Sequence, residues 1–240
     1  MSLPLLFLHG WGQSRQVWEK QRAAFPDATY LNLPGHGGEE DASAWVESMA
    51  AQLPDTPSII IGWSLGGIIA MQLAVEYPEK VAAAALVSTT PSFCSKQGWG
   101  HGSSDELFQA FRSGIETNSA KTMSRFFALM FQGDQISRQQ FNEIARIAVD
   151  RDNPPSEEGL KQGLEMLEKC DLRHQLNQII QPVLVMHGEQ DGVIPVSAGR
   201  HLAESMVNST LLSFDNCGHA PFLSHSEIFN KTLEAWCHKI

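Results

Sequence analysis

Hydrophobic residues in the first ninety positions occur in short, nearly continuous blocks, each bounded by glycine, proline, asparagine or aspartate. The blocks are PLLFLHG (4–10), TYLNLPG (29–35), SIIIGWS (58–64) and VAAAALVST (81–89). They do not alternate between apolar and polar residues, which is typical of strands that helices cover on both faces. The blocks therefore predict strands of a buried sheet.

Segments with helical character separate these blocks. The clearest are SAWVESMAAQL (43–53) and LGGIIAMQLAVEYPE (65–79), and Pro78 is expected to end the second helix. Strand, helix and strand in this order predict a mostly parallel sheet with right-handed crossovers. The fold class that follows is α/β.

The alternation stops after Thr90. Residues 91–169 contain amphipathic stretches, DELFQAFRSGIE, AKTMSRFFALMF and RQQFNEIARIAV, but no clear strand. Strand-like blocks return at QPVLVMHG (181–188) and STLLSFDNCG (209–218), before a last helix around SEIFNKTLEAWCHKI. We therefore expect one core domain from residues 1–90 and 170–240, with residues 91–169 inserted as a helical cap over the site.

Composition and charge narrow the class of protein. Of the 240 residues, 42% are hydrophobic and 18% are charged, which is typical of a globular chain. The net charge of −10 argues against nucleic acid as a partner, because phosphate binding needs clustered positive charge. The four cysteines lie far apart, and their spacing suggests neither a zinc site nor a CxxC pair. No apolar stretch suits a signal peptide or a membrane span, so we expect a cytoplasmic protein.

Ser64 lies in the sequence GWSLG (62–66), directly after an apolar block and before a helical segment. This sequence matches G-x-S-x-G, in which a sharp turn between a strand and a helix exposes the serine hydroxyl. The five-residue pattern alone is weak. The strand before it and the helix after it favour Ser64 as a nucleophile over a structural turn residue.

A nucleophilic serine needs a histidine that takes its proton and a carboxylate that holds the histidine. Asp191 follows the strand-like block of VLVMHGEQDGVIP, and His219 follows the next block in LLSFDNCGHAPF. The order serine, aspartate, histidine is the order expected of this fold. Four nearby residues compete for these roles: the histidines His187 and His225, which we expect to be structural, and the acids Asp215 and Glu189.

The oxyanion of an acyl-transfer reaction needs two backbone donors. The amide of Leu65, directly after the candidate nucleophile, is one candidate. The amide of Trp11, in the glycine-rich turn HGWG (9–12), is the other. A plain glycine turn with a core tryptophan is the alternative interpretation.

The motifs HGWG, LPGHG, GWSLGG, HGEQDGVIP and GHAPF resemble those of the α/β-hydrolase superfamily over essentially the whole chain. More narrowly, GWSLGG, RFFALM, GLEMLEKCDLR and HAPFLSH resemble the BioH group, the carboxylesterases that hydrolyse pimeloyl-acyl-carrier-protein methyl ester in biotin synthesis. The resemblance implies an α/β-hydrolase fold and a carboxylic ester hydrolase that needs neither metal nor cofactor.

The resemblance also implies roles for single residues. Ser64, Asp191 and His219 would form the catalytic triad. Trp11 and Leu65 would donate to the oxyanion and contact the acyl group. Phe126, in RFFALM (125–130), would line the substrate channel.

Basic cap residues of such enzymes dock the acidic acyl carrier protein. Lys121, Arg125, Arg138 and Arg146 stand at or near those positions. Residues 112–146 carry five basic and three acidic side chains, so this segment is net positive within an acidic chain. An ordinary solvated helix face is the alternative interpretation.

Two features depart from the family pattern. The chain starts almost directly on its first strand, so we expect it to lack the one or two leading strands common in this fold and to form about six strands. Asn142 stands where relatives can carry a further arginine, which would weaken or shift carrier docking. We expect a monomer.

The first hypothesis is therefore an esterase that acts on a carrier-bound methyl ester. A general short-chain carboxylesterase or a carbon–carbon bond hydrolase could use the same triad, because fold and triad do not determine the substrate. A haloalkane dehalogenase is disfavoured, since its nucleophile would be an aspartate. A binding protein with a vestigial triad is the hypothesis from another class.

Overall fold

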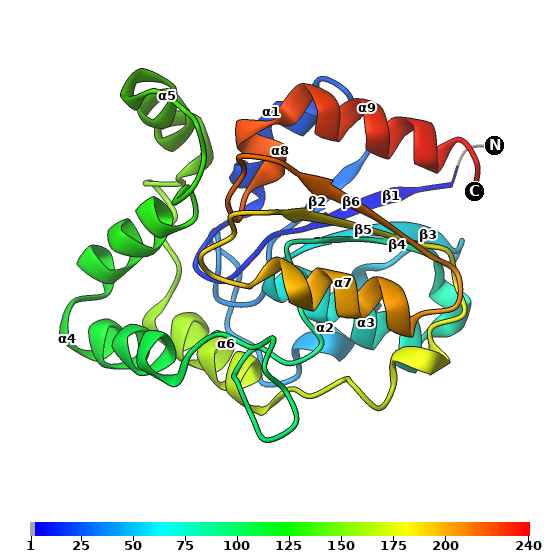
Figure 1. Ribbon diagram of the computed structural model, residues 1–240, viewed down its shortest axis with the longest axis horizontal. Coiled ribbons are helices and arrows are strands. Elements are labelled where there is room, and N and C mark those ends of the chain that lie inside the picture. The colour runs from blue at the N-terminus through cyan, green and yellow to red at the C-terminus, as the bar shows by residue number, and fades with distance from the viewer. Residues whose placement is uncertain (1–2) are drawn as a thin grey trace.

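A computed structural model describes residues 3–240, and its centre is a six-stranded sheet (Figure 1). Every pair of neighbouring strands is parallel, and the order across the sheet is β2-β1-β3-β4-β5-β6. The strands are β1 (Leu5–Leu8), β2 (Thr29–Leu31), β3 (Ser58–Trp63), β4 (Val81–Val87), β5 (Val183–Gly188) and β6 (Ser209–Phe214). The predicted α/β fold with about six parallel strands is confirmed.

The apolar blocks form the central strands. Every residue of β3 and of β5 is buried, as expected of strands covered on both faces. β6 lies at the edge of the sheet, and Phe214 is its only buried residue. The pairing of Ile60 with Leu6 on one side and Ala84 on the other places β3 at the centre of the core.

Helices cover both faces of the sheet. Figure 1 shows α1, α8 and α9 on one face and α2, α3 and α7 on the other. Their bounds are α1 (Glu19–Arg22), α2 (Trp45–Gln52), α3 (Leu65–Glu76), α7 (Val196–Ser205), α8 (Pro221–Ser224) and α9 (Ser226–Cys237). Three short 3-10 helices, η1 (Arg15–Trp18), η2 (Pro78–Lys80) and η3 (Leu176–Gln178), complete the core. Pro78 opens η2 just after α3 ends, so the chain leaves the helix where the sequence indicated.

Three helices connect β4 to β5: α4 (Asp105–Leu129), α5 (Arg138–Ala148) and α6 (Glu157–Lys169). Each begins after a serine, Ser104, Ser137 or Ser156, whose hydroxyl accepts a hydrogen bond from the backbone N–H three residues later. Figure 1 shows α4 and α5 beyond the edge at which the strands end. The division of the chain into a core and a cap at residues 91–169 stays a prediction.

Helix α4 is interrupted at Asn118, whose φ of −161° and ψ of 89° are not helical. The side chain of Asn118 accepts a hydrogen bond of 2.9 Å from the amide of Lys121, as the N-cap of a new helix does. The second half of α4 therefore takes its own direction. Met123, in this second half, lies against Gly12. A Cβ on Gly12 would lie 2.0 Å from the methyl carbon of Met123.

The carboxyl ends of the parallel strands meet at one edge of the sheet, where sites of α/β proteins form. Ser64 follows β3, Asp191 follows β5 and His219 follows β6. Within residues 3–240, no helix combines the length and the apolar character needed to cross a membrane.

Candidate active site

Ser64 occupies a strained turn between β3 and α3. Its φ of 55° and ψ of −117° lie in a region that residues other than glycine rarely adopt. The end of β4 holds this conformation, because the Ser64 amide donates to the Val87 carbonyl at 2.9 Å. The Thr89 hydroxyl in turn donates to the Ser64 carbonyl at 2.7 Å.

The two glycines of the serine motif leave no room for a side chain. A Cβ on Gly62 would lie 2.4 Å from the Gly66 carbonyl oxygen. A Cβ on Gly66 would lie 2.5 Å from the His9 carbonyl oxygen. The close approach of α3 to β3 and to the loop after β1 therefore explains the G-x-S-x-G spacing at Ser64.

Asp191 and His219 form a buried pair. His219 Nδ1 lies 2.7 Å from Asp191 Oδ2, and neither side chain is exposed. The other ring nitrogen, Nε2, is buried and has no hydrogen-bond partner within residues 3–240. The carboxylate thus holds Nδ1–H and leaves Nε2 able to accept a proton.

The backbone N–H and the carbonyl of His219 both make hydrogen bonds to other segments of the chain. The His219 amide donates to the Met130 carbonyl at 2.7 Å, just after α4. The Trp63 indole N–H donates to the His219 carbonyl at 2.9 Å. Trp63 directly precedes Ser64, so this bond ties the histidine loop to the serine turn.

The Asp191 carboxylate has four partners. Its Oδ1 accepts hydrogen bonds from the amides of Val193 and Ile194 at 2.8 and 2.9 Å. Its Oδ2 faces His219 and, at 3.2 Å, His187 Nε2. Burial by itself raises the pKa of Asp191, but the charge of His219 and hydrogen bonds from both histidines outweigh it and hold this pKa below its usual range. Asp191 is therefore a carboxylate.

The competing residues lie in other surroundings. Glu189 pairs with Arg200 at 2.7 Å near the surface, and Asp215 is exposed. His225 lies 3.9 Å from Asp134, away from Asp191. His187 does contact Asp191, which the sequence did not reveal beyond the spacing of four residues; its Nε2 also lies 2.9 Å from the Ile194 carbonyl.

The loop after β1 runs beside the candidate nucleophile. A Cβ on Gly10 would lie 3.1 Å from the Ser64 Cβ. The amides of Trp11 and Leu65 make no hydrogen bond within the part of the chain that the structure describes. Both amides are thus free to donate to a substrate oxygen, as an oxyanion hole requires.

Helices α4, α5 and α6, which connect β4 to β5, are called the inserted helices below. The Trp11 side chain packs against α4 and α6 of this group. Its indole N–H donates to the Leu160 carbonyl at 2.9 Å. The ring centroids of Phe111 and Phe126 lie 5.6 and 5.2 Å from that of Trp11. A Cβ on Gly163 would lie 2.6 Å from the Trp11 ring, so α6 can approach only because this residue is glycine.

Two buried histidines bond the loop after β1 and the loop after β2 to each other. The sequence did not predict this role, although both residues stand in the quoted glycine-rich motifs. His36 Nε2 accepts a hydrogen bond of 3.1 Å from the Gly12 amide. His9 Nε2 accepts one of 2.9 Å from the Leu33 amide. Only neutral rings can accept these bonds. Burial lowers the pKa of His9 to about 3, helped by His36, and burial lowers that of His36 to about 4.

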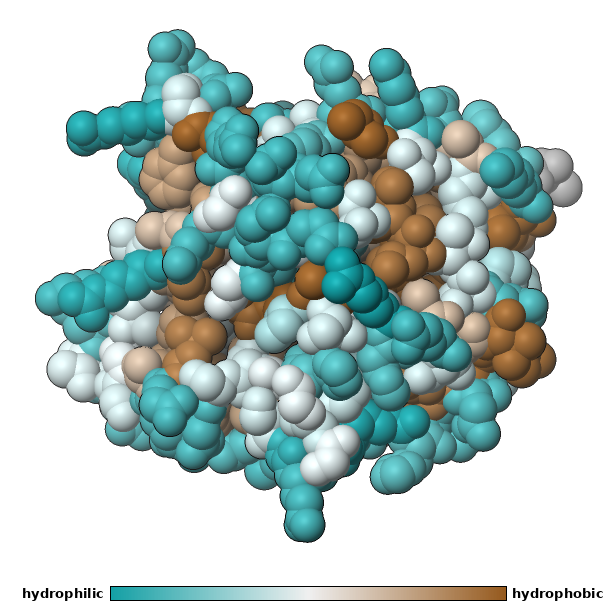
Figure 2. Space-filling view, in the orientation of Figure 1, coloured by the Kyte–Doolittle hydropathy of each residue, from teal (hydrophilic) through white to brown (hydrophobic). Residues whose placement is uncertain are grey.

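A cavity of about 650 Å³ lies between the loop after β1 and the inserted helices. Met123 and Phe127 of α4 and Phe141 of α5 give it apolar walls, and Gly12 lies at its border. Figure 2 shows hydrophobic surface between α4 and α5, at the left of the molecule. Phe126 packs on Trp11, and the phenylalanine of α4 that lines this cavity is Phe127.

The four candidate docking residues are exposed on the inserted helices. Lys121 and Arg125 lie one turn apart on α4, and Arg138 and Arg146 lie two turns apart on α5. Asn142 stands between the two arginines, and these three residues border a shallow groove. Within residues 3–240, none of the four basic side chains makes an ion pair. Their charges are free to attract an acidic partner.

The chain resembles known proteins in family, in sequence and in structure. A family model described as alpha/beta hydrolase fold matches residues 4–226. Two relatives named pimeloyl-[acyl-carrier protein] methyl ester esterase come from Nitrosomonas europaea and Aromatoleum aromaticum. The first relative is 35% identical, and the alignment covers 96% of this chain and 94% of the relative. The second is 36% identical, and the alignment covers 93% of each protein. A solved esterase from Exiguobacterium antarcticum has a TM-score of 0.87 at 22% identity, covering 99% of this chain and 93% of its own, and indicates the fold alone.

Proposed function

Because the chain belongs to the alpha/beta hydrolase fold family, we propose that it is a serine carboxylesterase that hydrolyses the methyl ester of pimeloyl-acyl carrier protein. The observation that carries the proposal is the name of the relatives that align over nearly the whole chain. The buried Asp191–His219 pair beside the turn of Ser64 supports it. The reaction belongs to biotin synthesis.

The proposed reaction begins when the Ser64 hydroxyl attacks the carbonyl carbon of the methyl ester. His219 Nε2 takes the hydroxyl proton, and the carbonyl oxygen becomes an oxyanion that accepts hydrogen bonds from the Trp11 and Leu65 amides. The tetrahedral intermediate collapses, and methoxide takes the proton from His219 and leaves as methanol. Ser64 then carries the acyl group.

The second half of the reaction repeats these steps with water. His219 takes a proton from water as its oxygen attacks the acyl-enzyme carbonyl. Collapse of the second intermediate returns the proton to Ser64 Oγ and releases the free carboxylic acid. Overall, the ester and one water molecule give the acid and methanol. Side chains and backbone amides of the protein perform each proton transfer and stabilise each charge. The ionised Asp191 stabilises the imidazolium that forms twice in each cycle.

The cavity beside Gly12 is the proposed site of the acyl chain. Ser64 and His219 do not line it, so the chain would extend from Ser64 past the loop of Gly12 to reach it. A pimeloyl chain consists largely of methylene groups, which the apolar walls of Met123, Phe127 and Phe141 would remove from water. Residues 91–169 supply most of these walls. This arrangement supports the proposal that residues 91–169 act as a cap over the site.

The exposed face of the inserted helices is the proposed dock for the acyl carrier protein. Lys121, Arg125, Arg138 and Arg146 would attract its acidic surface, although the chain as a whole carries a net charge of −10. The cavity lined by α4 and α5 lies on the same helices, so a carrier docked there could pass its acyl group inward.

The proposal includes a monomeric enzyme in the cytoplasm. All four cysteines are free thiols, which suits a reducing compartment. Small free esters are further substrates under this proposal, because the triad itself recognises only the ester group.

The test is methanol release from pimeloyl-acyl-carrier-protein methyl ester and from a short free methyl ester. We expect faster cleavage of the carrier-bound ester, and loss of both activities in Ser64→Ala. Ser113→Ala, which removes an exposed hydroxyl from α4, is the matched control and should keep both. Cleavage of the free ester alone would contradict the carrier-bound substrate, and activity that survives Ser64→Ala would contradict the nucleophile.

A further inference from the structure

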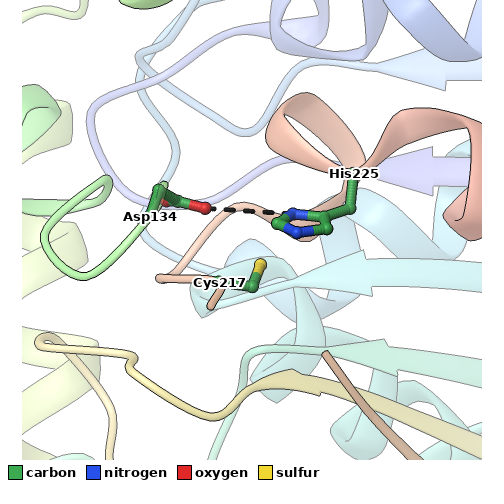
Figure 3. Close-up of side chains that lie close together, drawn as sticks. All are labelled: Asp134, Cys217 and His225. Carbon is green, nitrogen blue, oxygen red and sulfur yellow. Dashed lines mark ion pairs between the residues drawn. The ribbon is translucent and has the colours of Figure 1, made fainter. Parts of the chain in front are cut away.

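Asp134, Cys217 and His225 come together outside the candidate active site. One carboxylate oxygen, the thiol sulfur and one imidazole nitrogen all lie within 4.8 Å of one another. Figure 3 shows the three side chains pointing toward a common centre. They come from three separate segments: the connection from α4 to α5, the loop after β6, and the junction of α8 and α9.

Asp134 is the residue whose surroundings are incomplete. Its side chain is 0% exposed, and neither carboxylate oxygen has a hydrogen-bond partner within residues 3–240. Its Oδ1 lies 3.9 Å from His225 Nδ1. Burial raises the pKa of Asp134 above its usual range. The nearby Ser224 hydroxyl, Gly218 amide and Cys217 thiol act on this pKa in the opposite direction and offset burial only in part. A buried carboxylate is costly, and a cation between Asp134 and its neighbours would remove that cost.

The Cys217 thiol is held in place by its backbone. The Cys217 amide donates to the Gln190 side-chain oxygen at 3.0 Å, and its carbonyl accepts from the Gln190 amide at 2.9 Å. The sulfur is buried and lies 3.6 Å from the Ser224 hydroxyl. The two hydrogen bonds to Gln190 therefore hold the Cys217 backbone, and with it the sulfur, in place.

His225 gives the cluster an opening to solvent. Its side chain is 25% exposed, whereas that of Asp134 is fully buried. Its Nδ1 lies 3.0 Å from the Ser224 hydroxyl, which can rotate to accept or donate. An ion can therefore reach the centre past the imidazole, and Ser224 stands beside the centre as a fourth polar group.

We propose that Asp134, Cys217 and His225 form a structural site for a divalent transition-metal ion of the zinc type. Thiolate, imidazole and carboxylate are the ligands that Zn²⁺ takes in proteins, with bonds of about 2.0–2.3 Å. Such bonds at tetrahedral angles place two ligand atoms roughly 3.5 Å apart. The 3.9 Å between Asp134 and His225 is close to this value, so small side-chain movements close the site.

The charges also balance. The Asp134 carboxylate and the Cys217 thiolate each carry one negative charge, and neutral His225 carries none. A divalent cation makes the buried group neutral, while the Cys217 proton leaves to solvent on binding. Monovalent or trivalent ions would leave a net charge in a site that little water can reach.

The ion would brace the segment that carries His219. Cys217 precedes His219 by two residues, and the His219 amide donates to the Met130 carbonyl at 2.7 Å, four residues before Asp134. Gln135 also donates to Asn216 between the same two segments, through its amide at 3.4 Å and its side chain at 2.9 Å. A metal link between Cys217 and Asp134 would add to these bonds. The site thus supports the fold around His219 and touches neither Ser64 nor the substrate cavity.

The test is binding of ZnCl₂ to the chelator-treated full chain by titration calorimetry, and of Co²⁺ by absorption. We expect one ion per chain, a cobalt–thiolate charge-transfer band, and a higher midpoint of thermal unfolding. Cys217→Ser should abolish the band, and His225→Gln should weaken binding at least about tenfold. Cys237→Ser and His201→Gln are matched controls, because Cys237 lies elsewhere and His201 stacks on His101 at 5.8 Å.

Several results would overturn the proposal. They are no uptake of Zn²⁺, uptake without the thiolate band, or loss of binding in His201→Gln but not in His225→Gln. A plain hydrogen-bonded cluster of the three side chains predicts the first of these. If Cys217→Ser does not fold, His225→Gln and Asp134→Asn carry the test, with circular dichroism to establish that each variant is folded.

Discussion

The indole N–H of Trp63 donates a hydrogen bond of 2.9 Å to the carbonyl oxygen of His219. Trp63 precedes the candidate nucleophile in sequence, and His219 is the candidate base. One buried bond therefore connects the backbone beside the candidate nucleophile to the backbone of the candidate base. This bond makes the relative position of Ser64 and His219 a property of the core and not of a mobile loop.

Trp63→Phe should lower kcat more than it changes KM, because the ring still packs but the His219 loop loses its anchor. We expect a fall of about tenfold to a hundredfold in kcat and a loss of about 1–3 kcal/mol in unfolding free energy. Trp99→Phe is the matched control, since Trp99 donates a similar buried bond of 2.8 Å to the Ser92 carbonyl. If both variants lose activity equally, the bond acts through stability alone.

Asp191→Asn should lower kcat by about 10⁴-fold, the size of effect seen when a triad carboxylate becomes an amide. The amide cannot stabilise the imidazolium of His219 and can force the wrong tautomer. Glu189→Gln, two residues earlier, removes a partly exposed carboxylate that pairs with Arg200 and should leave kcat unchanged. Steady-state kinetics on the free ester measure both, and a small effect in Asp191→Asn would return Glu189 and Asp215 to consideration.

Acid should destabilise the fold through His9 and His36. Their pKa values fall from 6.5 to about 3 and about 4 in the folded chain, so below pH 6.5 the unfolded chain binds protons that the folded chain does not. This contribution to stability is complete above pH 6.5 and declines as the pH falls. The part from His36 is lost once the pH falls below about 4, and the part from His9 once it falls below about 3. Urea unfolding at a series of pH values measures the slope.

His36→Gln should reduce that slope, since glutamine does not titrate and its side-chain oxygen can still accept from the Gly12 amide. His174→Gln, at an exposed position, should leave the slope unchanged. Equal stability at pH 7 and pH 4.5 in the unmodified chain would show that these two histidines are not buried as neutral rings.

Substitutions of Phe127 and Phe126 should have different effects, because Phe127 lines the proposed substrate cavity and Phe126 packs on Trp11. Phe127→Ala enlarges the cavity and should raise KM for long acyl esters more than for short ones. Phe126→Ala removes the ring that packs on Trp11 at 5.2 Å, so it should cost about 3–5 kcal/mol in stability and lower kcat for all esters. Kinetics with esters of increasing chain length measure both, and equal KM changes across the series would contradict the assignment of the cavity.

Arg138→Glu and Arg146→Glu should raise KM for the carrier-bound ester several-fold and leave the free ester unaffected. The reason is loss of attraction to an acidic surface, so added salt should reduce the difference. Lys231→Glu on α9 is the control, because it reverses an exposed charge outside the insertion. Asn142→Arg should lower KM for the carrier-bound ester, and an equal effect on both esters would contradict docking at α5.

Much of the fold could be predicted because its signals are local. Blocks such as SIIIG predict strands buried on both faces, and β3 is buried at every residue. The glycines around Ser64 follow from a turn in which Gly62 and Gly66 have no room for a Cβ. Such steric demands act over a few residues and leave a readable pattern.

The tertiary structure alone decided which polar groups meet. Asp191 precedes His219 by one strand and one helix. The pairing of β5 with β6 places their loops side by side, and His219 Nδ1 lies 2.7 Å from Asp191 Oδ2. The approach of the connection between α4 and α5 to the junction of α8 and α9 brings Asp134 near His225. The turn after β5 folds Asp191 back against His187, which the sequence pattern does not indicate.

The sequence by itself therefore determined the order of strands and helices, the turn at Ser64 and the family resemblance, because short-range sterics and burial write these into neighbouring residues. The tertiary structure decided the partners of Asp191, the neutral state of His9 and His36, and the meeting of Asp134, Cys217 and His225. These depend on loops from distant parts of the chain that converge at the ends of parallel strands, and on a burial that no single segment creates.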